Sequence, residues 1–135
     1  MKTITAYFFR SLLVTFFCIW IIGCNAAFSK KVEFKKGEED IVNTVKLTYD
    51  FEEVNVLSTS EGDGKKFLII NLVNGKNLPN DSTLNAMGAK YATAINSAIQ
   101  NPNEFDVVKV AYISKTSGGI TKSSSSKVFE YNRIK

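Results

Sequence analysis

A largely apolar run near the N-terminus, residues 11–22, decides how much of this 135-residue chain is left to fold into a domain. Residues 1–10 carry two cations, Lys2 and Arg10, and no acid. A cationic start followed by an apolar run is typical of a secretory signal, and the run is shorter than the ~20 residues that a membrane-spanning helix needs. Roughly 100 residues remain, which is enough for a single domain with a modest core.

The tetrad Ile21-Ile22-Gly23-Cys24 follows directly. It resembles the lipobox of bacterial lipoproteins, in which a branched apolar residue, a small or apolar residue and a small residue precede a cysteine. The resemblance implies that diacylglycerol is attached to the Cys24 thiol and that a signal peptidase cuts between Gly23 and Cys24. The mature chain would then comprise residues 24–135, anchored to a membrane by its lipid.

Two other fates of this leader stay open on the residues alone. In an uncleaved signal anchor, Cys18 and Cys24 would be ordinary apolar residues. A general signal peptidase could also cut after Ala26 or Ala27, where small residues occur. Neither alternative leaves a lipid. Cys18 is a poor lipidation site because the bulky Phe17 precedes it.

The composition excludes several kinds of site in the rest of the chain. There is no histidine, and both cysteines precede residue 25, so the domain lacks an imidazole base, a disulfide and a thiolate zinc site. Without the two leader cations, 15 basic side chains face 13 acidic ones. The basic residues are dispersed apart from one cluster, Lys30, Lys31, Lys35 and Lys36. We therefore expect no cofactor, no metal and no nucleic-acid partner.

Three segments are predicted. Residues 1–23 form the signal peptide, residues 24–37 form the lipidated cysteine and a tether, and residues 38–135 form a small α+β domain. Residues 25–37 show no strong periodicity, and fully extended they would span at most ~45 Å.

The start of the domain, residues 38–51, fits two patterns. Three apolar residues recur at helical spacing: Ile41, Val45 and Tyr49. Four apolar residues also alternate as in a strand: Val45, Leu47, Tyr49 and Phe51. The acidic residues at 38–40 suit a helix N-terminus and favour the helix.

Two hairpins separated by a helix account for the rest. The strands of the hairpins are expected at 54–59 with 66–74, and at 106–114 with 126–134. The helix between them carries an apolar stripe, Leu84, Met87, Tyr91, Ile95 and Ala98. Asp81 or Ser82 is expected to cap this helix, and Asn101-Pro102 to end it.

The fold class predicted from this order is α+β, with the elements in the sequence α-β-β-α-β-β. A four-stranded, mainly antiparallel sheet would carry both helices on one face. The other face would be wholly or partly free for a partner.

Acidic residues and glycines give weak candidates for sites. The runs Glu38-Glu39-Asp40 and Glu52-Glu53 could bind a hard cation, but adjacent carboxylates on one element do not converge on a point. Residues 60–64, SEGDG, lack the oxygen spacing and terminal Glu of a calcium loop, so a hairpin turn is expected.

The run Ser123-Ser124-Ser125-Ser126 lies between two lysines, Lys122 and Lys127. A Ser-Lys dyad is formally open to such a segment, whereas a Ser-His-acid triad is excluded. A polar edge strand protected by lysine explains the same residues more simply. Ten aromatic residues follow the leader, and those on the outer face of the sheet could form a recognition surface.

Residues 38–134 resemble small uncharacterised lipoproteins of Gram-negative envelopes, on the lipobox, the short tether and a helix followed by Asn-Pro-Asn-Glu-Phe-Asp and a strand. The resemblance assigns no activity to particular residues. We expect a non-catalytic, membrane-anchored module that binds or scaffolds an envelope protein. The alternatives are a carrier or sensor for a small ligand or lipid between helices and sheet and, third, a Ser/Lys hydrolase. Asn25 is not the aspartate that retains some lipoproteins in the inner membrane, which favours the periplasmic side of the outer membrane.

Overall fold

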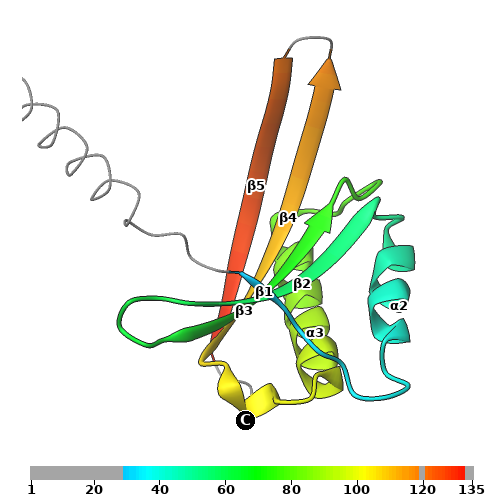
Figure 1. Cartoon of the computed structure of the whole chain (residues 1–135). Coiled ribbons are helices and arrows are strands. Elements are labelled where there is room, and N and C mark those ends of the chain that lie inside the picture. The colour runs from blue at the N-terminus through cyan, green and yellow to red at the C-terminus, as the bar shows by residue number, and fades with distance from the viewer. Residues whose placement is uncertain (1–28, 119–120, 133–135) are drawn as a thin grey trace, which may run out of the picture.

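The structure is a computed structural model in which residues 29–118 and 121–132 are described. Cys24 and the predicted cleavage site before it lie outside the described residues. The elements follow in the order β1 (Lys30–Lys31), α2 (Asp40–Thr48), β2 (Glu53–Ser60), β3 (Lys66–Val73), α3 (Asp81–Ala98), the short 3-10 helix η1 (Pro102–Glu104), β4 (Val107–Gly118) and β5 (Thr121–Asn132) (Figure 1).

The expected four-stranded, mainly antiparallel sheet in the order α-β-β-α-β-β is wrong. The sheet has five strands in the spatial order β1-β2-β3-β4-β5, and the element order is β-α-β-β-α-β-β. Three of its pairings are antiparallel, but β3 and β4 are parallel. Because α3 crosses over between these two neighbouring strands, the chain returns in the same direction and the sheet is mixed.

One face of the sheet packs against both helices. Every second residue of the central strands points inward, so Leu68, Ile70 and Leu72 of β3 are fully buried. Ile70 pairs with Val56 on one side and with Val110 on the other, and both are buried with it. The helices fill the layer above with Val45 of α2 and with Leu84, Tyr91, Ala92 and Ile95 of α3.

Both predicted helices are confirmed. The acidic start does favour helix over strand at 40–48, although Glu39 at its N-cap makes no side-chain cap bond. The cap of α3 is neither Asp81 nor Ser82 but Asn80, whose side chain accepts from the backbone N–H of Thr83 at 3.0 Å. Asparagine suits this position because its short side chain reaches the free N–H groups of the first turn.

Part of the expected tether is bound to the domain. Lys30 and Lys31 form β1, which pairs with Ser58 and Leu57 of β2. Further on, the backbone N–H of Lys35 donates to the Ala98 carbonyl at 2.9 Å. Two exposed lysines in succession have no apolar alternation, so the sequence pattern could not reveal this strand.

The far end of the sheet is a two-stranded projection. The last residue of β3, Val73, lies opposite Ile113, so residues 114–118 of β4 pair only with residues 121–125 of β5. This part, which we call the ribbon, is five residues long and so extends ~17 Å past the end of β3. It stands clear of the helices (Figure 1). The sequence predicted shorter strands because the ribbon is rich in Ser, Thr and Lys and carries no apolar alternation.

Candidate functional site

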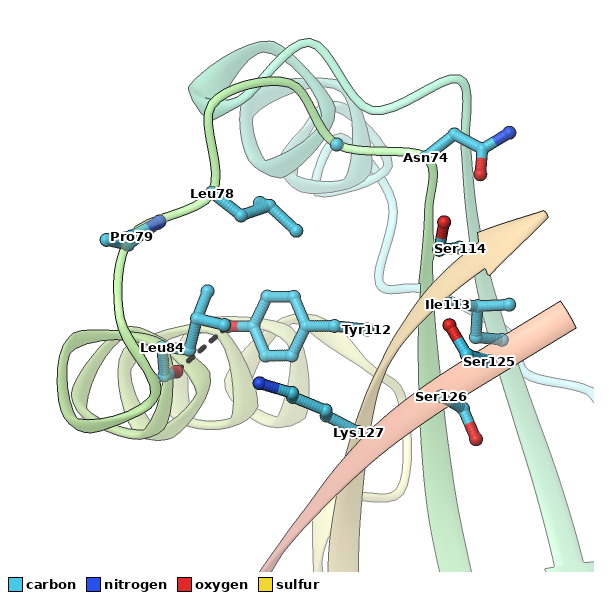
Figure 2. A pocket seen from close by; sticks show the side chains of 11 residues that line it. Asn74, Leu78, Pro79, Leu84, Tyr112, Ile113, Ser114, Ser125, Ser126 and Lys127 are labelled. Atoms are coloured by element: carbon cyan, nitrogen blue, oxygen red, sulfur yellow. Dashed lines mark hydrogen bonds between the residues drawn. The ribbon is translucent and has the colours of Figure 1, made fainter. Parts of the chain in front are cut away.

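The base of the ribbon borders a pocket of about 440 Å³. It lies between β4, β5, the connection from β3 to α3 and the first turn of α3 (Figure 2). Its lining consists of Asn74, Gly75, Leu78, Pro79, Leu84, Tyr112, Ile113, Ser114, Ser125, Ser126 and Lys127.

One side of the pocket is apolar. Leu78 and Leu84 face the ring of Tyr112 across the cavity, and Leu78 at the rim is 37% exposed (Figure 2). The Tyr112 hydroxyl donates to the Leu84 carbonyl at 3.0 Å, which fixes the ring against the first turns of α3. Burial raises the pKa of Tyr112, so the hydroxyl keeps its proton and stays a donor.

The other side of the pocket is polar. Lys127 of β5 forms an ion pair with Asp81, the first residue of α3. An aspartate at this end of a helix also faces the positive end of the helix dipole. Both side chains are more than half exposed, so the pair orients Lys127 more than it stabilises the fold. Ser114, Ser125 and Ser126 also line the pocket and add polar residues to it.

Asn74 holds the roof of the pocket in place. Its φ of 51° is in the left-handed region, which asparagine tolerates better than most residues. Its side-chain oxygen accepts from the backbone N–H of Lys115 at 2.6 Å, and its amide nitrogen donates to Glu52 at 2.7 Å. Our sequence interpretation missed this role, although the dipeptide Asn74-Gly75 is a recognised turn signal.

Gly75 is needed beside Asn74 for a different reason. A Cβ atom built at this position would overlap the ring of Phe51. The ring is 1% exposed and belongs to the core, so it has little room to move. The close contact between the Gly75 backbone and the Phe51 ring therefore fixes the start of the loop that forms the roof of the pocket.

The structure brings only part of the Ser/Lys segment together. Ser125, Ser126 and Lys127 line the pocket, whereas Ser123 and Ser124 lie earlier on β5, nearer the tip of the ribbon, and do not. The side chain of Lys122 lies outside the described residues. A lysine that activates a serine must be held in a dry site as a neutral amine. Lys127 is instead 59% exposed and paired with a carboxylate, an arrangement suited to binding rather than to proton transfer.

The acidic runs are spread over the surface. Glu38, Glu39 and Asp40 precede or begin α2. Glu52 accepts from Asn74, and Glu53 lies 4.0 Å from Lys115. Within residues 29–118 and 121–132, no group of three or more acidic side chains is placed to hold a metal ion. Residues 61–65 form the expected turn, closed by a 2.9 Å bond from the Glu61 N–H to the Lys65 carbonyl.

The aromatic residues do not form an exposed surface. Tyr49, Phe51, Tyr112 and Phe129 make a series of ring contacts under the helices, with centroids 6.0–6.3 Å apart. On the outer face of the sheet, Phe67 is 3% exposed and lies beneath the Lys109 ammonium group. The recognition surface suggested from the aromatic content is therefore not found among the described residues.

The outer backbone edge of β5 is a second binding feature, next to the pocket. β5 is 12 residues long and is the last strand in the sheet order. Within the described part of the chain no strand pairs with its outer side. Its residues 123–126 are exposed serines, whose small side chains leave the backbone N–H and C=O groups open.

Neither the helices nor the comparisons with known proteins point to a particular function. No helix in the described ranges has the length and apolarity needed to span a bilayer. No protein-family model matches the sequence, and comparisons with curated proteins and with solved structures find no similar protein.

Proposed function

We propose that this protein is a non-catalytic envelope lipoprotein, held in the outer membrane by lipid on Cys24, whose domain binds another envelope protein. The observation that carries the binding proposal is the open 12-residue edge of β5 beside the pocket. An extended segment of the partner would add to the sheet along β5. One of its apolar side chains would enter the pocket.

This binding mode follows from the groups that the edge and the pocket offer. A strand added to a sheet edge gains a ladder of main-chain hydrogen bonds, and specificity comes from pockets that receive alternate side chains. The lining of the pocket suits an apolar side chain, because Leu78, Leu84 and Tyr112 face each other across it. Its volume of about 440 Å³ admits a large side chain together with some of its backbone.

The anchor part of the proposal rests on the tetrad before Cys24. Burial of lipid contributes ~0.8 kcal/mol per methylene, and two or more chains are needed for durable attachment. Mass spectrometry of the mature N-terminus tests it. The wild type should begin at a lipidated Cys24, whereas Cys24→Ala should keep its leader and carry no lipid. An unlipidated wild type would remove the anchor.

The binding part is tested with two exposed leucines. Leu78 is at the pocket rim and Leu47 is on α2, 78% exposed and away from the pocket. Because neither is buried, Leu78→Asp and Leu47→Asp should both fold. After cross-linking in cells and capture from detergent-solubilised membranes, the Leu78→Asp chain should lose the partner that the wild type and Leu47→Asp recover. Equal recovery by both variants contradicts the proposal, and repeated failure to capture any partner with the wild type counts heavily against it.

A second candidate function is the binding of a small ligand or lipid. Its pocket would not be between helices and sheet, where side chains such as Ile70, Ile95 and Val110 are fully buried. The pocket at the ribbon base is the place that favours it, since its volume is within the range of known ligand sites. Native mass spectrometry of the protein purified from its own membranes tests this function. A stoichiometric adduct lost on Leu78→Asp supports it, and an adduct-free protein argues against it.

A further inference from the structure

The chain is fixed to the domain much closer to Cys24 than a free tether would allow. Lys30 and Lys31, which form β1, pair with β2. Phe34 bridges to Ile99, and the Gln100 N–H donates to the Glu33 carbonyl at 3.0 Å. The Lys35 ammonium donates to the Ser97 carbonyl at 2.6 Å, which places a cation at the C-terminal end of α3, where the last turn has no basic residue.

This attachment shortens the possible distance between lipid and domain. Only residues 25–29 separate Cys24 from the first residue of β1. Even fully extended, the chain from Cys24 to Lys30 spans at most ~21 Å, about half the ~45 Å expected for a tether that runs to residue 37. The side of the domain around Lys30 therefore cannot move far from the bilayer surface.

The surface around Lys30 is polar and basic. The β1 edge and the η1 region adjoin, because two small pockets are both lined by Lys30, Ser58, Glu104 and Phe105. Residues 30–36 include four exposed lysines: Lys30, Lys31, Lys35 and Lys36. Glu33 is the one acidic residue among residues 30–36, and the next acidic residues, Glu38, Glu39 and Asp40, lie at the start of α2. Lysines this close to a lipid anchor are attracted to anionic headgroups.

We propose that, in the lipid-anchored protein, the edge formed by residues 30–36 lies against the phospholipid headgroups. This orientation rests on the anchor at Cys24. β5 is at the opposite edge of the sheet, four strand spacings or ~19 Å away. The edge strand and its pocket are thereby held on the side of the domain that faces away from the bilayer, where a partner protein can reach them.

Site-specific fluorescence on the full, lipidated protein tests this orientation. A lipidated Cys24 has no free thiol, and the mature chain that begins at residue 24 has no other cysteine. Glu33→Cys and Thr116→Cys each therefore add one reactive thiol, at exposed positions on the proposed membrane-facing edge and on the ribbon. Each labelled protein is reconstituted into phosphatidylethanolamine–phosphatidylglycerol vesicles that contain an acceptor dye on the headgroups.

The expected result is energy transfer at least about twofold stronger from position 33 than from position 116, because the short link holds position 33 near the headgroups. Equal transfer from both positions, or stronger transfer from position 116, overturns the orientation. Inserting about fifteen Gly-Ser residues after Asn25 should remove the contrast, since a flexible link of that length lets the domain turn freely. A contrast that survives the insertion shows that the link length is not its cause and also overturns the inference.

A charge-reversal pair tests the role of the lysines. Lys30→Glu with Lys31→Glu should reduce the contrast in phosphatidylglycerol vesicles by about half or more. The matched control, Lys46→Glu with Lys90→Glu on the helices, should leave the contrast unchanged. Equal effects of the two pairs contradict a headgroup-facing basic edge.

Failure of the anchor is seen separately. A wild type that reacts with the thiol dye, or that does not float with the vesicles, has no lipid on Cys24, and both the anchor and the orientation fall. If the wild type floats with the vesicles and does not react with the dye, but the two labelled variants show no contrast, the orientation alone falls.

Discussion

The centre of the sheet and the ribbon share strand β4 but obey different physical constraints. In the centre, Ile70 and Val110 are fully buried between neighbouring strands and the helices. In the ribbon, β4 and β5 pair only with each other, and Ser123, Ser124 and Ser125 are exposed. Burial of apolar surface supplies most of the folding free energy, so stability should reside in the centre. The ribbon is then free to vary its side chains and expose its edge for binding.

The largest expected effect is in the centre. Ile70→Ala removes three buried carbon atoms from a site with 0% exposure and leaves a cavity between β2, β3 and β4. We expect the free energy of unfolding to fall by about 2–5 kcal/mol. Urea denaturation followed by circular dichroism measures it. A loss below about 1 kcal/mol would mean that the centre is not a close-packed core.

The second effect tests how β5 is joined to the centre. A Cβ atom at Gly88 of α3 would overlap the Tyr131 hydroxyl, which donates to the Asn85 carbonyl at 2.7 Å. Gly88→Ala should therefore destabilise the fold by about 1–3 kcal/mol, despite the better helix propensity of alanine. Because the clash is with the hydroxyl, adding Tyr131→Phe should recover part of this loss. Additive losses in the double variant would refute the contact as the cause.

The third effect depends on pH and concerns Tyr112 of β4, which lines the pocket at the base of the ribbon. Burial raises the pKa of Tyr112 above its ordinary value near 10, so the unfolded chain loses this proton before the folded one. Stability is then full below pH 10 and falls as the pH rises through the folded-state pKa, by up to about 1.4 kcal/mol per pH unit for one group. Tyr112→Phe should flatten this fall in urea midpoints measured from pH 9 to 11.

Tyr112→Phe also changes stability at neutral pH, where it removes the bond to the Leu84 carbonyl. A loss of about 0.5–1.5 kcal/mol is expected there. Tyr91 and Tyr131 also have raised pKa values through burial, so a residual slope is expected in the variant. An unchanged slope would mean that Tyr112 is not the group responsible.

The same contrast explains what the sequence could predict. The apolar stripe of α3 and the branched residues of β3 pack in the hydrophobic core. Their spacing in the sequence therefore located both elements. β1 and the ribbon are held by backbone pairing of polar residues, which leaves no periodic signal in the side chains. The expected symmetry of two helix-hairpin units also hid the parallel pairing, although a strand-helix-strand order between β3 and β4 favours it.

The candidate site was predictable only in pieces. Lys127 and the serines beside it were noticed as a polar run, but their neighbour Asp81 is 46 residues away in the sequence. The pocket also depends on the left-handed backbone at Asn74, which positions Leu78 over Tyr112. Such a site arises from the crossing of distant segments, and local patterns do not specify it.

The smallest expected effect is in the ribbon and makes the comparison sharpest. Ser124 is exposed, pairs with Lys115 across the ribbon and has no side-chain hydrogen bond within the described contacts. Ser124→Ala and Ser124→Arg should each change the free energy of unfolding by no more than about 0.5 kcal/mol. In the cross-linking assay, however, arginine should reduce partner capture because its long side chain obstructs the outer edge of β5, while alanine should not. If Ser124→Ala destabilises the domain as strongly as Ile70→Ala, the ribbon is part of the cooperative core, and the separation of binding from stability is wrong.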